Sequence, residues 1–205
     1  MKYHAAFISD IHLGTKRSEI DRAIHFLKDQ EFEHLYLVGD IIDGVAIKRK
    51  EFWNDSSNDF LSEVLKKAKL GTKVTYLTGN HDKFLEDFWG NDFGGITISD
   101  EVLHTTKEGK TYSVLHGHQF HSMFLHLFLK CNQIRRFRDG IENNAITHAA
   151  KKGVDGVICG HTHEPKIRKQ NNITYINIGD WVENLTCLVE RGDGKLELIS
   201  LNKDN

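Results

Sequence analysis

The chain has little of what marks secreted, disulfide-stabilised or nucleic-acid-binding proteins. Its 205 residues include only three cysteines, Cys131, Cys159 and Cys187, an odd number without any Cys-x-x-Cys spacing. We expect these cysteines to be reduced and packed in the interior, as in cytosolic proteins. Lysine and arginine total 27 and aspartate and glutamate 29, for a formal net charge of -2, so no overall basic field indicates nucleic acid as a partner.

Long hydrophobic runs are also lacking. No segment approaches the roughly 18 apolar residues of a membrane-spanning helix, and Asp10 interrupts the first apolar stretch before a signal-peptide core of about seven residues can form. We see no internal repeat, low-complexity tract or linker. We therefore expect a single domain, residues 1–205, in the cytoplasm, able to bury on the order of 70% of its unfolded surface.

Five short polar motifs stand out, each directly after an apolar run that predicts a β-strand. The strands lie at 7–9, 35–38, 74–77, 112–115 and 157–159. Open α/β sheets place their functional sites at the carboxyl ends of their strands, so we expect the motifs to converge there. They are Asp10-Ile11-His12, Gly39-Asp40-Ile41-Ile42-Asp43, Gly79-Asn80-His81-Asp82, His116-Gly117-His118 and Gly160-His161-Thr162-His163.

Such a set of side chains predicts a metal site. Its aspartate oxygens, asparagine carbonyl and imidazoles exceed the roughly four protein ligands that satisfy a single zinc ion, which favours two ions. Imidazole is a ligand for manganese, iron or zinc, whereas magnesium prefers oxygen. We therefore expect two divalent metal ions, Mn, Fe or Zn.

Each motif alone has an ordinary structural explanation. A histidine at a strand end is usually a surface residue, and an aspartate after glycine usually marks a turn. That all five motifs occur in series for such ordinary structural reasons is improbable. Two residues are different: Asp82 more plausibly fixes its loop or caps the next helix, and His118 is open between a substrate contact and an ordinary surface position.

The ordered motifs resemble those of the calcineurin-like metallophosphoesterases, D-x-H, G-D-x-x-D, G-N-H-[DE], H and G-H-x-H, over residues 10–163. This resemblance implies an α/β fold, a four-layer αββα sandwich of two mixed sheets flanked by helices, with a short helical cap near the site. It also implies a ligand set for each ion: Asp10, His12, Asp40 and His163 for one, and Asp40, Asn80, His116 and His161 for the other.

In this scheme Asp40 bridges the ions and a bridging hydroxide attacks phosphorus, which makes the protein a dinuclear-metal phosphoester hydrolase. His81 has no ligand role. We expect it to stabilise the transition state or protonate the leaving oxygen, with Asp43 orienting its imidazole.

The remaining periodicity predicts two helices and several antiparallel strands. Apolar residues at helical spacing mark 20–27 and 60–68 as amphipathic helices. Alternating segments at 96–98, 102–105 and 111–115, and again at 174–178, 186–189 and 196–201, predict antiparallel strands.

One segment, 119–137, combines an apolar stripe at helical spacing with a basic end. A helix that packs this stripe on the sheet is the commoner explanation, but the segment follows His116 and so lies beside the site. We predict a cap segment, 118–148, in which Phe120, Phe124, Phe128 and Arg135 bind substrate. An apolar stripe with a cationic margin suits a phosphorylated lipid or a peripheral membrane contact.

A narrower resemblance rests on residues 7–14 and on the later run Asn177-Ile178-Gly179-Asp180-Trp181-Val182-Glu183. These are similar to segments of the bacterial UDP-2,3-diacylglucosamine pyrophosphohydrolase group of lipid A biosynthesis, which implies cleavage of a diphosphate or phosphodiester bond in a UDP-diacylglucosamine-like substrate. This chain has His81 and His118 where that group typically has Arg and Asp.

Two other functions stay open. One is a soluble phosphodiesterase or phosphatase acting on nucleotides or phosphoproteins. The other is a binding scaffold that keeps this fold without catalysis, which the intact ligand set disfavours. The sequence does not predict the oligomeric state.

Overall fold

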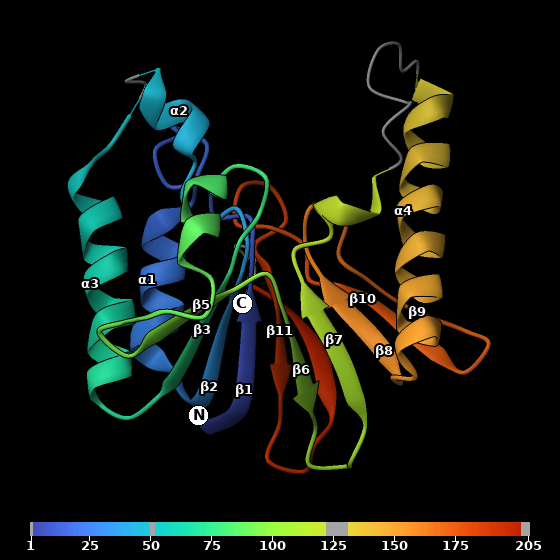
Figure 1. Cartoon of the computed structure of the whole chain (residues 1–205). Helices are drawn as coiled ribbons and strands as arrows, with labels where there is room; N and C mark the ends of the chain where they lie inside the picture. The colour runs from blue at the N-terminus through green and yellow to red at the C-terminus, as the bar shows by residue number, and fades with distance from the viewer. Residues whose placement is uncertain (1, 50–51, 122–130, 202–205) are drawn as a thin grey trace.

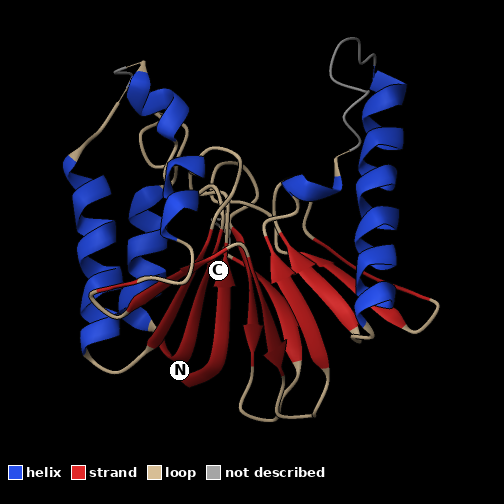
Figure 2. Ribbon diagram, in the orientation of Figure 1, coloured by secondary structure: helices blue, strands red, loops and turns tan. Residues whose placement is uncertain are grey.

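Two β-sheets face each other and helices cover their outer faces (Figures 1 and 2). This arrangement comes from a computed structural model that describes residues 2–49, 52–121 and 131–201; the side chains of 131–137 are not described. Among these residues, no helix combines the length and the apolar character that crossing a membrane requires.

The first sheet has seven strands in the order β12-β11-β1-β2-β3-β5-β4. Strands β1, β2, β3 and β5 run parallel, and the antiparallel strands β11, β12 and β4 complete the two edges. Helices α1 and α3 cover the outer face, and the short α2 follows β2 (Figure 1). The bounds are β1 Lys2–Ile8, α1 Ile20–Asp29, β2 Glu31–Val38, α2 Gly44–Lys48, α3 Asp55–Lys69, β3 Lys73–Leu77, β4 Asp92–Phe93, β5 Ile96–Ser99, β11 Thr186–Glu190 and β12 Leu196–Ser200.

The second sheet has five strands in the order β6-β7-β8-β10-β9. Its central strands β7, β8 and β10 are parallel, with β6 and β9 antiparallel at the edges. Helix α4 covers its outer face. The bounds are η1 Lys83–Phe88, β6 Glu101–Thr105, β7 Thr111–Leu115, η2 His118–Phe120, α4 Cys131–Lys152, β8 Gly156–Cys159, β9 Lys166–Gln170 and β10 Ile173–Asn177.

Three buried clusters hold these layers together. The first joins α1 and α3 to the seven-stranded sheet and includes Ile24, Leu27 and Phe60. The second lies between the sheets, and the third joins α4 to the five-stranded sheet through residues such as Ile141. The predicted four-layer sandwich of two mixed sheets is therefore confirmed.

The two helices and the five feeder strands predicted from the sequence are all present, but two strands pair differently from the prediction. Residues 174–177, predicted among the antiparallel strands of the tail, lie in β10, which runs parallel to β8 and antiparallel to β9 in the five-stranded sheet. Residues 96–98 do not join the antiparallel strands that follow; they form β5, which runs parallel to β3 in the other sheet. The 18-residue connection between Leu77 and Ile96 is long enough to return the chain to the start of the sheet, as a parallel neighbour requires. Only β4 pairs with β5 in the antiparallel sense.

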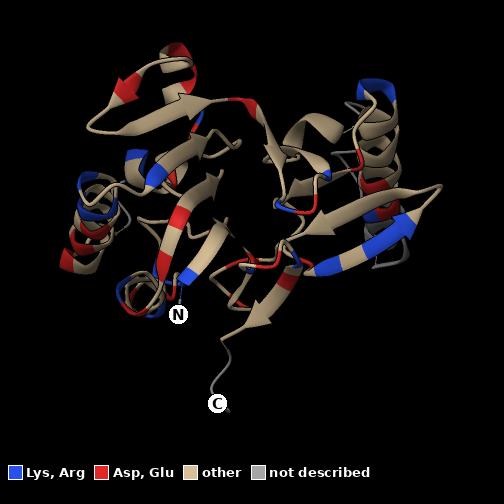
Figure 3. Ribbon diagram, turned by 90° about the horizontal axis from the view of Figure 1, so that it is seen from below, with Lys and Arg blue, Asp and Glu red and all other residues tan. Residues whose placement is uncertain are grey.

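Charges are mixed over the side of the molecule seen from below (Figure 3). The most basic strand there is β9, but Glu142 of α4 pairs with two of its cations, Lys166 and Arg168, at 2.5 and 2.8 Å. Cys159 and Cys187 are free and buried, as expected of packed, reduced cysteines.

Candidate metal centre

The five predicted motifs meet at the carboxyl ends of β1, β2, β3, β7 and β8, at the upper edge of both sheets in Figure 1. Their ligand atoms form three groups, in each of which all atoms lie within 4.8 Å of one another. The groups are Asp10, His12 and His163; Asp40, His116 and His161; and His12, Asp43 and His81. His12 belongs to two of the groups, and its Nε2 lies 3.9 Å from Asp40 Oδ2 of the remaining group, so the three form one continuous site.

The backbone at this site is strained. Five residues adopt a positive φ, which side chains other than glycine rarely do: Asp10 at 52°, His12 at 55°, Asp40 at 50°, His161 at 69° and His163 at 56°. Such conformations cost on the order of 1–3 kcal/mol each and concentrate at functional sites. Here they turn each side chain sharply off the end of its strand toward the common centre.

Glycines in the motifs let the loops approach the two buried aspartates closely. A Cβ atom on Gly79 would collide with the carboxylate of Asp40, and one on Gly160 would collide with that of Asp10. Both motifs therefore need glycine at these positions for steric reasons.

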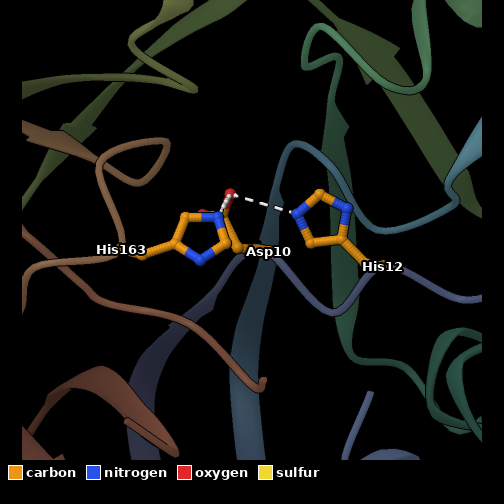
Figure 4. Close-up of side chains that lie close together, drawn as sticks. All are labelled: Asp10, His12 and His163. Carbon is orange, nitrogen blue, oxygen red and sulfur yellow. Dashed lines mark ion pairs between the residues drawn. The ribbon is translucent and has the colours of Figure 1, made fainter. Parts of the chain in front are cut away.

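Each buried aspartate uses one oxygen to hold the backbone and presents the other to imidazoles. Asp10 Oδ2 accepts from the amide of His161 at 2.9 Å, while Oδ1 lies 3.1 Å from His163 Nε2 and 3.8 Å from His12 Nε2 (Figure 4). Asp40 Oδ1 accepts from the amide of His81 at 2.7 Å, while Oδ2 lies 3.3 Å from His116 Nε2 and 3.9 Å from His12 Nε2.

Three buried atoms of predicted ligands make no hydrogen bond within the described structure: Asp10 Oδ1, Asn80 Oδ1 and His116 Nε2; among the other motif residues the same holds for His81 Nδ1 and His118 Nδ1. Buried polar atoms are nearly always satisfied, so convergent exceptions need a reason. All three are of the types that coordinate divalent cations. The donor set therefore fits metal ions.

Charges couple the side chains of the site. Burial lowers the pKa of His116, but the carboxylates of Asp40 and Asp10 outweigh this effect and raise it to about 10. Burial raises the pKa of Asp10, and nearby histidines reverse this and lower it overall. Burial and the charges of His116 and His121 lower the pKa of His161 to about 3. The raised pKa of His116 thus reflects the negative charge of the two carboxylates near it.

Asp43 contacts two imidazoles. Its Oδ1 accepts from the amides of Val45 and Ala46 at the start of α2, at 3.0 and 2.8 Å. Its Oδ2 lies 2.9 Å from His81 Nδ1 and 3.1 Å from His12 Nδ1. The contact with His81 matches the sequence prediction, whereas the contact with His12 has no signal in the sequence.

Asp82 fixes its loop, one of the two structural roles considered for it. Its carboxylate accepts from the amides of Ile41 and Gly79 and from the Tyr76 hydroxyl. It makes no side-chain capping bond to η1. His118 is partly buried, with its ring 5.6 Å from that of His116, and burial with the charge of His116 lowers its pKa to about 4.

Three further residues support the centre and were not identified from sequence. Asp180 is fully buried, with Oδ2 3.8 Å from His163 Nδ1. Asn177 donates to the Gly160 carbonyl and the Thr162 hydroxyl, which fixes the loop that carries His161. His121 contacts His161 through its Nε2 atom. Asp180 and Asn177 lie in the run that carried the narrower resemblance, the only sequence signal for them.

The predicted substrate-binding residues are placed only in part. Phe120 is 7% exposed and packs in the core cluster with Ile141 and Ala145, the position of an ordinary packing residue. Phe124 and Phe128 lie outside the described residues. Arg135 lies in α4, and its side chain is not described.

Two facing mixed sheets with clustered aspartate and histidine at their strand ends define a metal-dependent phosphoesterase. The profile of the calcineurin-like phosphoesterase superfamily domain matches residues 3–188, and the chain belongs to this family. Its cofactors are accordingly divalent metal ions.

Curated relatives cover nearly the whole chain. The chain is 26% identical over 233 aligned residues to UDP-2,3-diacylglucosamine hydrolase of Shewanella loihica, covering 90% of this chain and 91% of the relative. It is 25% identical over 240 residues to the protein of the same name from Neisseria meningitidis serogroup B, covering 93% and 95%.

Solved structures share the fold at lower identity. A structure described as a novel archaeal phosphodiesterase has a TM-score of 0.53 at 20% identity, covering 96% of this chain and 99% of that one. Vacuolar protein sorting 29 of Cryptosporidium parvum has a TM-score of 0.54 at 15% identity, covering 96% and 95%. These likenesses concern the fold alone.

Proposed function

We propose that this phosphoesterase hydrolyses a diphosphate or phosphodiester bond in a UDP-diacylglucosamine-like substrate at a site for two divalent ions. The observation that carries the two-ion proposal is the position of Asp40 Oδ2, which faces histidines of both groups, His116 and His12. One carboxylate oxygen between two sets of ligands is the arrangement that bridges a pair of ions.

The ligands we assign to the first ion are Asp10, His12, Asp40 and His163, and those to the second are Asp40, Asn80, His116 and His161. When bound, the two ions supply Lewis-acid chemistry, polarising phosphoryl oxygens and lowering the pKa of water. The chain supplies the geometry. The hydrogen bond from His116 Nδ1 to the Val38 carbonyl, 2.9 Å long, leaves Nε2 as the coordinating nitrogen.

We propose that His81 protonates the leaving group. Its Nδ1 lies against Asp43, so Nε2 is the ring nitrogen left for a substrate, and its side chain is 33% exposed. The ring sits 4.8 Å from that of His12, nearly perpendicular to it. His81 is thus beside the ligands and open to solvent, where it can donate a proton to an oxygen that leaves phosphorus.

The names of the relatives and three exposed apolar side chains near the metal centre support a lipid-linked substrate. Val45 and Ile47 on α2 and Phe84 on η1 are 41%, 38% and 47% exposed. They follow Asp43 and Asp82 closely in sequence, and a Cβ atom on Gly44 would meet the Phe84 ring. Exposed apolar side chains next to a polar centre suit a molecule with both acyl chains and phosphate.

A soluble nucleotide or phosphomonoester is the second candidate, and two observations favour it. Phe120 is buried in the core, so it offers no surface to an acyl chain. The alignment to the Shewanella relative is 233 residues long, more than the 205 of this chain, so that relative carries residues that this chain lacks. A shorter chain leaves fewer residues to cover acyl groups.

A substrate comparison tests the proposal. Purified protein loaded with Mn²⁺ is assayed on UDP-2,3-diacylglucosamine, its deacylated form, a cyclic nucleotide, a phosphoprotein and an aryl phosphate, with His116→Ala as the control without metal function. We expect kcat/KM to be at least about tenfold higher for the acylated than the deacylated substrate, because burying acyl carbons contributes about 0.8 kcal/mol per CH₂. Equal values would refute the lipid proposal, and no metal-dependent hydrolysis of any substrate would refute the catalytic assignment.

A further inference from the structure

His121 contacts the centre although it belongs to none of the five motifs. It directly follows η2, and its Nε2 is hydrogen-bonded to the Nε2 of His161. The two rings are 4.4 Å apart, centroid to centroid, at an interplanar angle of 55°. His121 thus contacts one of the proposed ligands without belonging to the group of ligand atoms around Asp40, His116 and His161.

The turn that carries His121 is anchored on several sides. Phe120 is buried under α4, and its carbonyl accepts from Asn144 Nδ2 at 2.9 Å. Gln119 accepts from the amide of Gly117 and donates to Asp100. The amide of His121 donates to the His118 carbonyl at 3.2 Å. The position of His121 beside His161 is therefore fixed by the fold.

The other three proposed histidine ligands share a pattern of ring contacts that suggests a role for His121. Each turns one ring nitrogen toward the site and the other toward an oxygen that can accept a hydrogen bond. His116 Nδ1 donates to the Val38 carbonyl at 2.9 Å, His12 Nδ1 lies 3.1 Å from Asp43, and His163 Nδ1 lies 3.8 Å from Asp180. At His161 the neighbour in the corresponding position is the imidazole of His121 instead of an oxygen.

A hydrogen bond between two ring nitrogens needs one N–H and one lone pair. We propose that His121 is the positioning residue for His161: its Nε2 accepts the Nε2–H of His161, which leaves the Nδ1 lone pair of His161 for the second metal ion. This inference rests on the proposed ligand role of His161. An outer hydrogen-bond partner fixes the tautomer and ring orientation of a ligand, and its loss typically lowers metal affinity about 10- to 100-fold.

The test uses two variants and a control. His121→Phe keeps a ring but removes the acceptor, His121→Gln restores an acceptor oxygen, and His25→Phe makes the same change at an exposed histidine of α1. Each protein, labelled with ¹⁵N-histidine, is titrated with ¹¹³Cd²⁺. The two cadmium signals and competition with a chelator give the affinity of each site, and ¹¹³Cd–¹⁵N couplings identify the coordinating nitrogens.

We expect His121→Phe to weaken the site of His116 and His161 at least tenfold and to change the site of Asp10 and His163 less than threefold. His121→Gln should recover most of the affinity, and His25→Phe should match the wild type. In the wild type, cadmium should couple to His161 Nδ1 and to neither nitrogen of His121. In the metal-free wild type, the proton of the His161 ring should be on Nε2.

Other outcomes overturn the inference. Coupling of cadmium to His121 would make it a direct ligand, and equal weakening of both sites would make it a general structural residue. Unchanged affinity in His121→Phe, or no recovery in His121→Gln, would remove it from the site. A wild-type protein that binds no cadmium would refute the proposed function as well, which separates that failure from failure of this inference alone.

Discussion

Replacing Asp82 should destabilise the protein, because this one carboxylate joins two motif loops to β3. It accepts from the Ile41 amide at 3.0 Å, from the Tyr76 hydroxyl at 2.7 Å and from the Gly79 amide. The side chain is fully buried. In Asp82→Ala all three donors lose their acceptor, and a buried unsatisfied donor costs about 1–3 kcal/mol. Allowing for relaxation, we expect a loss of about 3–5 kcal/mol in the free energy of unfolding.

For a chain of this length each kcal/mol lowers the melting temperature by about 2–4 °C, so Asp82→Ala should melt about 6–20 °C below the wild type. Tyr76→Phe is the matched control, because it removes one of the three bonds and should cost about 1 kcal/mol. Thermal unfolding of metal-free protein, followed by circular dichroism, measures both. The reasoning is refuted if Asp82→Ala melts within about 2 °C of the wild type, or if Tyr76→Phe costs as much.

Three further changes test separate parts of the molecule. His81→Ala should keep both metal ions yet lower kcat by about 10²-fold, which is the effect expected of a positioned proton donor. Metal analysis and steady-state kinetics of the variant check this, and an unchanged kcat excludes His81 from the mechanism. Burial and the charge of Lys73 lower the pKa of His34 to about 3, so between pH 6.5 and 3 the unfolded chain binds a proton that the folded chain does not. The unfolding free energy of metal-free protein should therefore rise with pH over this range, and His34 should contribute at most about 1.4 kcal/mol per pH unit. His34→Gln should flatten the slope of unfolding free energy against pH, measured by urea titration. An identical slope in the variant contradicts the argument. His104→Phe removes the imidazole that lies 2.6 Å from fully buried Glu190. Burial lowers the pKa of His104, so the change removes a hydrogen bond to a carboxylate and should cost about 1.5–3 kcal/mol in urea unfolding; a loss below about 1 kcal/mol shows that the carboxylate finds other partners.

The convergence of the five motifs could be predicted because its signals are local. Each motif is a polar turn directly after an apolar strand, and the carboxyl ends of parallel strands lie at one edge of a sheet. The strand pairing of residues 96–98 could not be predicted in this way. Their alternation is the same in a parallel and an antiparallel neighbour, and only the tertiary fold brings β5 beside β3.

Two elements had weak sequence signals. Strand β9 consists of three basic residues, a glutamine and a single isoleucine. Its clearest sequence signal is the Asn171-Asn172 turn, with φ of 50° and 64°, that joins it to β10. Beyond the apolar stripe, α4 buries a face of Ile141, Ile146 and small alanines in a mostly polar sequence. Small residues pack closely against a sheet but give little amphipathic contrast.

The outer contacts of the site depend entirely on tertiary structure. Asp43 serves His12 as well as His81, and Asp180 and His121 reach His163 and His161 from other parts of the chain. No regular spacing in the sequence predicts these pairs. Sequence reasoning thus reached the proposed ligands but missed most of the residues that orient them.

Metal content of Asp40→Ala tests the central claim most directly, because the account depends on one carboxylate serving both ions. Protein loaded with Mn²⁺ and freed of excess metal is analysed by atomic emission, with His12→Ala and Asn80→Ala as variants that should each weaken one site more than the other. We predict two equivalents in the wild type and a loss from both sites together in Asp40→Ala. Two full equivalents in Asp40→Ala would contradict the bridging role and the two-ion site built on it.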